Sequence, residues 1–183
     1  STVLANLVAG GFVGELSVVN RHVRTLQGRR SYPNIAEVPG PVDLAIICVP
    51  ADGVLEVVHQ CAEAQVRAVL VVSGGFAESG PEGEQRQDEL RREARRAGIR
   101  VIGPNSFGII NTDPSIRLNA TLAPHVPPAG RLGLFAQSGA LGIAVLASAA
   151  RRNLGVSTFA SAGNRVDVSG NDLMQYWIDD DET

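Results

Sequence analysis

The sequence predicts an α/β fold in which a parallel sheet is covered by helices on both faces. Apolar runs of strand length alternate with segments of helical periodicity, which is typical of a doubly wound sheet. Only 4% of the residues are aromatic, so the core must be built from Val, Ile, Leu and Ala, as in buried parallel strands. The connections from strand ends into helices are short, as parallel crossover units require.

The first half of the chain is expected to contain three helices and four strands. An apolar helical face near the N-terminus ends at two glycines, and Asp52 stands at an N-cap position. The third helix is dense in Glu and Arg, so most of its surface must face water. The predicted elements are a helix at 1–11, strands at 15–20 and 42–49, a helix from Asp52, a strand at 68–72, a helix at 81–97 and a strand at 100–102.

A segment with three prolines and a glycine, residues 124–130, is expected to be a linker between two domains. Residues 1–123 would form the first domain. The alternation then restarts with strands at 131–136 and 156–160 and helices at 141–152 and from Gly170, so residues 131–183 would begin a second domain. Two strands are too few to close a sheet, and the chain opens on a helix without an initiator Met. We therefore expect further sequence at both ends.

The composition argues against nucleic-acid, membrane and metal-binding roles. The net charge is −3, and all sixteen basic residues are arginines dispersed along the chain. No apolar run approaches the roughly 20 residues of a membrane span and no signal-peptide pattern is present, so a cytoplasmic protein is expected. Cys48 and Cys61 belong to no metal-ligand pattern and are expected to be buried in a reducing compartment.

Small or helix-breaking residues stand at four predicted strand ends. Ligands of an open parallel sheet bind at the carboxyl ends of its strands, so these are candidate binding loops. Two successive glycines remove the β-carbons that would keep a slender ligand away from the main chain, although for any single loop a plain turn is an equal explanation. The candidate cofactor-binding residues are Asn20, Arg21, Val49, Pro50, Ser73, Gly74, Gly75, Asn105 and Ser106.

A fifth turn is a candidate anion site. Residues Gln137, Ser138, Gly139 and Ala140 connect a predicted strand to a helix, so free N–H groups and the positive end of the helix dipole converge there. The alternative is that Ser138 only caps the helix. A serine nucleophile is disfavoured, because the turn lacks the G-x-S-x-G pattern.

Five stretches of the sequence carry a recognisable pattern. They are residues 41–50 (PVDLAIICVP), 103–108 (GPNSFG), 137–142 (QSGALG), 161–164 (SAGN) and 167–172 (DVSGND). Taken together, they resemble a known family, the NDP-forming acyl-CoA synthetases, which include ADP-forming acetate–CoA ligase and the succinyl-CoA ligase alpha subunit. The matches are collinear and cover essentially the whole chain.

The resemblance implies a fold, a cofactor and a reaction. The fold is a Rossmann-like CoA-binding parallel sheet followed by a partial flavodoxin-like domain of the succinyl-CoA synthetase type. The reaction interconverts acyl-CoA, phosphate and ADP with a carboxylate, CoA and ATP, through an acyl phosphate and a phosphohistidine. The family's first strand and its glycine-rich loop would precede residue 1.

The resemblance also implies residue roles. Val49, Pro50 and residues 73–75 would line the groove for pantetheine and adenine. Asn105 and Ser106 would lie near the thiol end, and Ser106 stands where many relatives have Cys. Arg21 falls where many relatives have a lysine near the CoA phosphates, and the anion at residues 137–140 would be the phosphate of the phosphohistidine or of the acyl phosphate.

None of the three histidines, His22, His59 and His125, matches the family's phosphohistidine motif. That histidine is expected downstream, so no catalytic residue is expected in this chain, which would bind CoA, acetyl-CoA or another acyl-CoA without turnover. Mg-ADP or Mg-ATP would bind only to a partner, either an ATP-grasp domain or a beta subunit of the same enzyme. A homodimer is left open.

Two other functions are weighed against this one. The same kind of domain occurs as a non-catalytic CoA- or acyl-CoA-binding regulatory domain of protein lysine acetyltransferases. An NAD(P)-dependent oxidoreductase is disfavoured, because the chain has neither G-x-G-x-x-G nor an acidic residue placed to hold a ribose. The sequence leaves open the acyl substrate, the choice between ADP and GDP, and whether the full-length protein is catalytic or regulatory.

Overall fold

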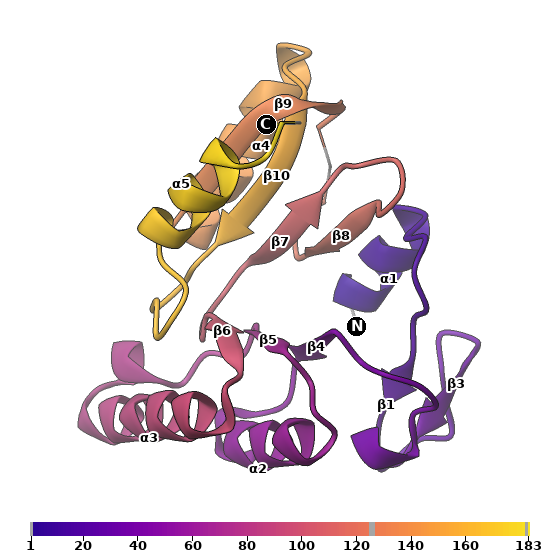
Figure 1. The fold of residues 1–183 in the computed structure, drawn as a ribbon, viewed down its shortest axis with the longest axis vertical. Coiled ribbons are helices and arrows are strands. Elements are labelled where there is room, and N and C mark those ends of the chain that lie inside the picture. The colour runs from indigo at the N-terminus through magenta and orange to yellow at the C-terminus, as the bar shows by residue number, and fades with distance from the viewer. Residues whose placement is uncertain (1, 125–126, 182) are drawn as a thin grey trace.

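The computed structural model describes residues 2–124, 127–181 and 183, and confirms the α/β class. The central sheet has three parallel strands in the order β4-β5-β6. Helices α2 and α3 cover one face of this sheet, and α1 with the hairpin β7–β8 lies on the other (Figure 1). The bounds are α1 Thr2–Ala9, β4 Leu44–Ile47, α2 Ala51–Glu63, β5 Ala68–Val71, α3 Pro81–Ala97 and β6 Arg100–Ile102.

The middle strand β5 is buried on both faces, as its unbroken aliphatic sequence predicts. Val69 and Val71 are fully buried and pack into the cluster that includes α2 and α3. Leu70 is equally buried but belongs to the opposite cluster, with Val3 and Leu7 of α1. Successive side chains of a strand point to opposite faces, so one short strand supplies both layers of the core.

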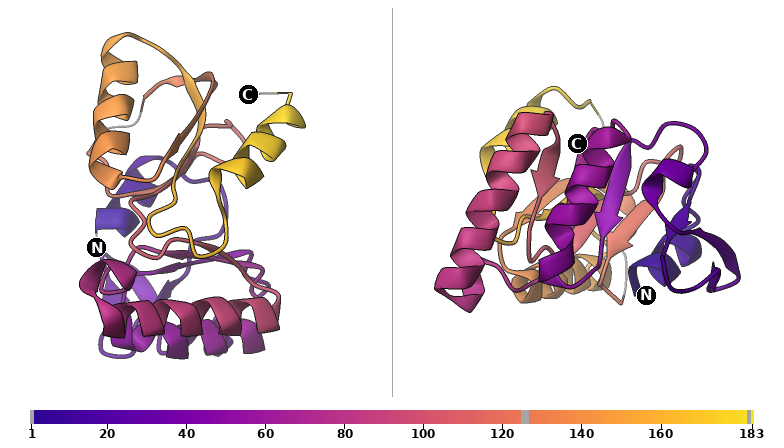
Figure 2. Two further views of the ribbon diagram at one scale, coloured as in Figure 1. Left: turned by 90° about the vertical axis from the view of Figure 1, so that its left-hand side faces the viewer. Right: turned by 90° about the horizontal axis from the view of Figure 1, so that it is seen from below.

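The second sheet has four strands in the order β8-β7-β10-β9. β9 and β10 are parallel, whereas β7 pairs antiparallel with both β10 and β8. Helices α4 and α5 lie on opposite sides of β9 and β10 (Figure 2). The bounds are β7 Gly108–Asn111, β8 Leu118–Thr121, β9 Ala129–Ala136, α4 Gly139–Arg151, β10 Val156–Ser161 and α5 Gly170–Ile178.

The hairpin β7–β8 was not expected from the sequence. Both of its strands precede the expected linker at residues 124–130, yet β7 pairs with β10 from beyond it. The two strands expected after the linker therefore lie in a four-stranded sheet. β9 begins at Ala129, so regular structure starts within the expected linker.

The segment after β10 runs along the outer edge of β6. The Val166 N–H donates to the Gly103 carbonyl and the Val168 N–H to the Val101 carbonyl, both at 3.0 Å. Residue numbers increase along this segment as they decrease along β6, so the pairing is antiparallel. Val166 is 3% exposed and joins the core beneath the central sheet. The second unit, meaning the four-stranded sheet with α4, α5 and the segment between β10 and α5, thus covers an edge of the first unit, which is built on the central sheet.

Arg100 anchors the same segment from β6. Its Nε donates to Asp167 Oδ2 at 2.8 Å and its guanidinium meets Asp172 Oδ1 at 3.0 Å. Asp172 also accepts from the hydroxyl and the amide of Ser169, at 2.6 and 2.9 Å, and this capping box begins α5. The Ser169 hydrogen bonds, together with Arg100, lower the pKa of Asp172 to about 2.

The region before β4 differs from expectation. The strand expected at 15–20 is only two residues long and pairs with β3 in a small separate sheet, in the order β1-β3-β2. Only Val18 of this strand is buried, so little apolar burial supports a longer one. The bounds are β1 Val18–Val19, β2 Thr25–Leu26, β3 Arg29–Tyr32 and the 3-10 turn Ile35–Glu37.

Two single-residue expectations are corrected. Asp52 does not cap α2, because Pro50 occupies the N-cap; Asp52 lies in the first turn and pairs with Arg86 at 3.0 Å. Cys48 is exposed at the end of β4, since it follows the last strand residue, whereas Cys61 is buried as expected. Burial raises the pKa of Cys61 to about 11.

The described part of the chain contains no helix long and apolar enough to cross a membrane. Within the same residues, no group of three or more His, Cys, Asp or Glu side chains could hold a metal ion.

Gly83→Ala should destabilise the fold. A Cβ at Gly83 would lie 1.9 Å from the Phe76 carbonyl oxygen, so α3 would have to move, at a cost of about 1–3 kcal/mol in the free energy of unfolding. Gly53 is the matched control, because it is also the third residue of its helix and a Cβ there would find Val49 no closer than 3.5 Å. Gly53→Ala should leave stability unchanged or raise it by up to about 1 kcal/mol. Urea unfolding measures both, and equal effects would contradict this packing.

Asp172→Asn should lower the free energy of unfolding at neutral pH, because it removes a carboxylate that Ser169 and Arg100 hold in its charged form. The pKa of Asp172 falls from 3.8 to about 2 on folding. The stabilisation is therefore complete above the unfolded-state pKa and is lost as the pH falls through the folded-state pKa. Urea unfolding between neutral pH and about pH 2 should show a difference between the two chains that shrinks with acidity. A difference that does not depend on pH would exclude this linkage.

Candidate functional site

Three of the predicted strand-end loops lie together at the carboxyl edge of the central sheet. The Ser73 hydroxyl donates to the Val49 carbonyl at 2.5 Å, which joins the loops after β5 and β4. The Asn105 N–H donates to the Ser73 carbonyl at 2.8 Å, which joins the loop after β6 to both. Residues from three parallel strands thus form one continuous surface, as the doubly wound fold requires.

The two glycines after β5 differ in backbone conformation and in surroundings. Gly75 has a φ of +97°, which favours glycine, and a Cβ there would lie 3.0 Å from the Ala51 Cβ. Gly74 is exposed, and a Cβ there would lie 3.2 Å from Glu78 Oε1 and 3.4 Å from Asn105 Oδ1. No acceptor among the described residues takes the Gly74 N–H. This backbone donor is therefore accessible to a ligand.

The two residues after the cis peptide Gly103-Pro104 face in different directions. Asn105 is exposed and has a φ of +57°, beside Gly74. Ser106 is 3% exposed; its hydroxyl donates to the Ser161 carbonyl at 2.5 Å and accepts from the Gly108 N–H at 3.0 Å. Asn105 can therefore meet a ligand directly, whereas the Ser106 side chain binds the second sheet.

Asn20 and Arg21 form local contacts. Asn20 Oδ1 accepts from the amides of His22 and Val23, at 2.8 and 3.2 Å, and Arg21 Nε donates to the His22 ring at 3.2 Å. The Asn20 backbone pairs with residues of β3. These bonds remain within the small sheet and do not join either residue to the three loops.

The turn between β9 and α4 combines a capping serine with amides that have no acceptor among the described residues. The Ser138 side chain accepts from the Leu141 amide at 3.4 Å, so the helix cap that the sequence offered as the alternative is present. Among the described residues, nothing accepts from the amides of Gly139 and Ala140 at the start of this 13-residue helix. Gln137 is exposed beside them. Free donors and the helix dipole therefore coincide, which suits an anion.

This turn, residues 137–140, is called the anion turn below. It lies close to the loops after β4, β5 and β6, which are called the cofactor loops and include residues 49–50, 73–75 and 105–106. A Cβ at Gly139 would lie 2.9 Å from the Phe107 ring. The Ala162 N–H donates to the Ala136 carbonyl at the end of β9, and the Asn164 N–H donates to the Pro104 carbonyl, both at 2.9 Å. The loop after β10 therefore bridges the anion turn and the loop after β6, where β10 points toward β6 (Figure 1).

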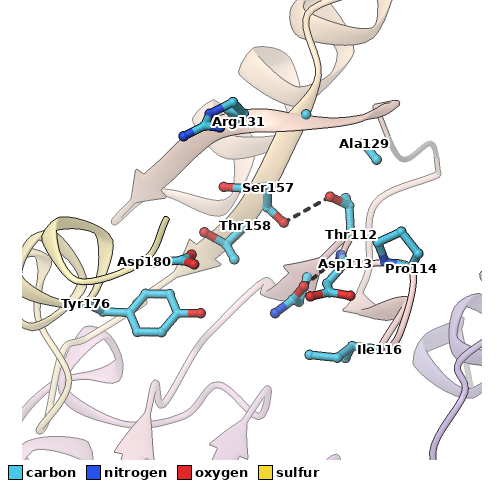
Figure 3. Close-up of a pocket in the computed structure, with 12 residues that line it drawn as sticks. Thr112, Asp113, Pro114, Ile116, Ala129, Arg131, Ser157, Thr158, Tyr176 and Asp180 are labelled. Carbon is cyan, nitrogen blue, oxygen red and sulfur yellow. Dashed lines mark hydrogen bonds between the residues drawn. The ribbon is translucent and has the colours of Figure 1, made fainter. Parts of the chain in front are cut away.

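A cavity of about 350 Å³ lies elsewhere (Figure 3). Ser157 and Thr158 line it from the amino-terminal half of β10, away from the Ser161 end that meets the loops, and Tyr176, Arg131 and Asp113 are also on its wall. None of the predicted site residues lines it. The candidate site is an open edge of the sheet and lies apart from this cavity.

The histidines have no role at this edge in the described structure. His59 Nε2 lies 3.3 Å from Glu93 on the outer surface of α2 and α3, and it lines a second cavity there. His22 interacts with Arg21, and His125 lies outside the described residues.

Comparison with known families matches both parts of the chain. Residues 1–112 match the CoA binding domain, and residues 129–183 match the succinyl-CoA ligase like flavodoxin domain.

Curated relatives and solved structures agree with the family models. The chain is 37% identical to the alpha subunit of acetate–CoA ligase [ADP-forming] I of Pyrococcus furiosus, covering 99% of this chain and 40% of that protein. It is 38% identical to acetate–CoA ligase [ADP-forming] I of Archaeoglobus fulgidus, covering all of this chain and 26% of that protein.

Among solved structures, the dinucleotide forming acetyl-coenzyme A synthetase 1 of Ca. Korarchaeum cryptofilum superposes with a TM-score of 0.94 at 39% identity, over 100% of this chain and 39% of that one. The same enzyme is also known in complex with phosphate and ADP. The chain thus spans 40% or less of the length of these relatives. It belongs to the CoA-binding-domain family, and a succinyl-CoA ligase like flavodoxin segment follows in the same chain.

Proposed function

We propose that this chain is the CoA-binding part of an ADP-forming acyl-CoA synthetase. The whole protein would interconvert acyl-CoA, phosphate and ADP with a carboxylate, CoA and ATP, and acetate is the acid named for the relatives. The observation that carries the proposal is the shared edge on which the cofactor loops and the anion turn meet. A reaction that exchanges a thioester with phosphate needs both ligands at one place.

The division of labour follows the expected domains. Residues 1–123 would bind CoA and residues 131–183 would begin the ligase domain that holds a phosphate. Mg-ADP or Mg-ATP would bind to an ATP-grasp domain or beta subunit, and one relative is itself described as a subunit alpha. The phosphohistidine would likewise lie outside this chain, which would bind ligands without turnover.

The cofactor loops suit a slender ligand with amide groups, such as the pantetheine arm of CoA. CoA itself supplies the thiol that is acylated. Gly74 presents an N–H and no side chain, so a ligand carbonyl can approach the main chain and accept from it. Val49 and Pro50 would add apolar surface beside the loop that holds Ser73, which bonds to the Val49 carbonyl. Asn105 supplies an exposed amide next to Gly74.

The anion turn would hold the phosphoryl group. The amides of Gly139 and Ala140 are free to donate, and the dipole of α4 favours negative charge at this end. The Ser138 hydroxyl is engaged by the Leu141 amide, so it would act as a cap and leave phosphate binding to the backbone.

Gly74→Leu should weaken CoA binding at least tenfold, because a side chain there would stand between the Glu78 carboxylate and Asn105, where the ligand is expected to approach the free N–H. Calorimetric titration with CoA measures this directly. Glu63→Leu is the control, since Glu63 is exposed at the far end of α2 and should bind CoA as the unchanged chain does. Binding of NAD without binding of CoA by the unchanged chain would overturn the proposed function.

Ala140→Pro should abolish phosphate binding at the anion turn. Proline removes the N–H of the second residue of α4 but is tolerated in the first turn of a helix, so the fold should persist. In the unchanged chain, inorganic phosphate should shift the amide NMR signals of Gly139 and Ala140 saturably, and the Gly139 shift should disappear in the variant. Glu82→Pro, at the second residue of α3, is the matched control and should leave the Gly139 response intact. Persistence of that response in Ala140→Pro would remove the turn from the site.

A further inference from the structure

The carboxylate of Glu78 accepts hydrogen bonds from backbone amides of the cofactor loop after β5. Glu78 lies in the 3-10 turn η2, Ala77–Ser79, and its Oε1 accepts from the amides of Gly75 and Phe76 at 2.6 and 3.1 Å. Partial burial opposes ionisation, but hydrogen bonds from Asn164 and from these amides outweigh it and hold the pKa of Glu78 below its usual range. The loop therefore carries a fixed negative charge beside Gly74.

The other carboxylate oxygen binds the second unit. Asn164 Nδ2 donates to Glu78 Oε2 at 2.6 Å and to Gln87 Oε1 at 2.8 Å, so both of its hydrogens are used. Gln87 is 8% exposed, and its Oε1 also lies 3.4 Å from the Ala77 amide, which fixes the orientation of its side chain. The direction of each hydrogen bond among Glu78, Asn164 and Gln87 is therefore determined: Asn164 donates, and Glu78 and Gln87 accept.

The carbonyl side of the same loop is held independently. Arg86 donates to the Gly75 carbonyl, and its guanidinium also pairs with Asp52 at 3.0 Å. Gly75 is thus fixed through its N–H by Glu78 and through its carbonyl by Arg86. Its neighbour Gly74 keeps an N–H with no acceptor among the residues described.

We propose that Glu78 and Asn164 are positioning residues for the cofactor loop, whose mutual contact holds Gly74 so that its N–H faces the uncharged amide part of CoA. This rests on the proposed function. Because Glu78 already occupies the Gly75 and Phe76 amides, the loop offers no pair of donors to a phosphate, and its ligand contact is with a neutral group. The loop after β10 thereby takes part in binding a cofactor held by the central sheet.

A reciprocal exchange of donor and acceptor tests the contact. Glu78→Gln keeps an oxygen for Gly75 and Phe76 but turns an NH₂ group toward the NH₂ group of Asn164. Asn164→Asp places a carboxylate against the carboxylate of Glu78, which is repulsive. In the double variant, the amide introduced at position 78 can donate to the carboxylate introduced at position 164. Gln87 can then turn its NH₂ group toward that carboxylate and give up its 3.4 Å contact with the Ala77 amide, so a complementary set is restored.

Calorimetric titration with CoA should show each single variant binding about tenfold more weakly than the unchanged chain, and the double variant recovering to within about threefold of it. Recovery in the double variant separates positioning from a loss of fold, because two independently damaging changes would add. Glu56→Gln is the matched control: Glu56 accepts from Gln60 at 3.2 Å on the exposed side of α2, and its exchange should leave CoA affinity unchanged.

The outcomes distinguish the two proposals. If the unchanged chain does not bind CoA, the proposed function fails and this inference fails with it. If the unchanged chain binds CoA but both single variants bind equally well, or the double variant is no better than the weaker single one, only the positioning role is overturned. Should a charged single variant fail to fold, Asn164→Ala leaves Glu78 on the loop amides and should still weaken CoA binding several-fold; unchanged affinity would refute the role.

Discussion

The backbone pairing of residues 166–168 with β6 is the contact on which the rest of the structure depends. It closes one edge of the central sheet with main-chain bonds at 3.0 Å and buries Val166 beneath that sheet. Unpaired strand edges are unfavourable, so this pairing protects β6 and also fixes the position of the second unit against the first. The loops at the carboxyl ends of β6 and β10 then meet around Pro104 and Asn164.

Close approach of backbones reinforces this junction. A Cβ on Gly163 would lie 2.2 Å from the Pro104 carbonyl oxygen, so only glycine permits the two loops to touch. Ser106 adds a buried hydroxyl that bonds to the Ser161 carbonyl. The junction is therefore built from small residues and main-chain groups, and the Gly74 and Gly139 amides near it have no acceptor among the described residues.

Much of the fold could be predicted from the sequence because its strands and helices have strong local patterns. The helix at 81–97 and the strand at 100–102 have the expected bounds, since Pro81 and Gly98 mark the helix ends. The hairpin β7–β8 could not be predicted in this way. Its second strand, Leu118–Thr121, contains Asn119 and Thr121, which are buried and bond to each other, so its hydrophobic alternation is hidden.

The candidate site was predictable in part for a similar reason. Glycine and proline at strand ends are local signals, and the loops they mark at 49–50, 73–75 and 105–106 do meet. The contact between Glu78 and Asn164 was not visible, because they are 86 residues apart and nothing in the sequence pairs Glu78 with the matched stretch 161–164 that contains Asn164. The sequence also could not show that Ser106 faces inward while Asn105 faces out, since this depends on backbone angles at a turn.

β10 pairs with β7, which precedes the proline-rich segment, and with β9, which begins within it. This pairing affects how the protein can be divided into fragments. If residues 1–123 were produced alone, β7 would lose its partner β10. The β7–β8 hairpin would then expose Ile110 and the unpaired N–H and C=O groups of β7. Such an exposed edge is a template for self-association. A cut after residue 123 would therefore divide one sheet between two fragments.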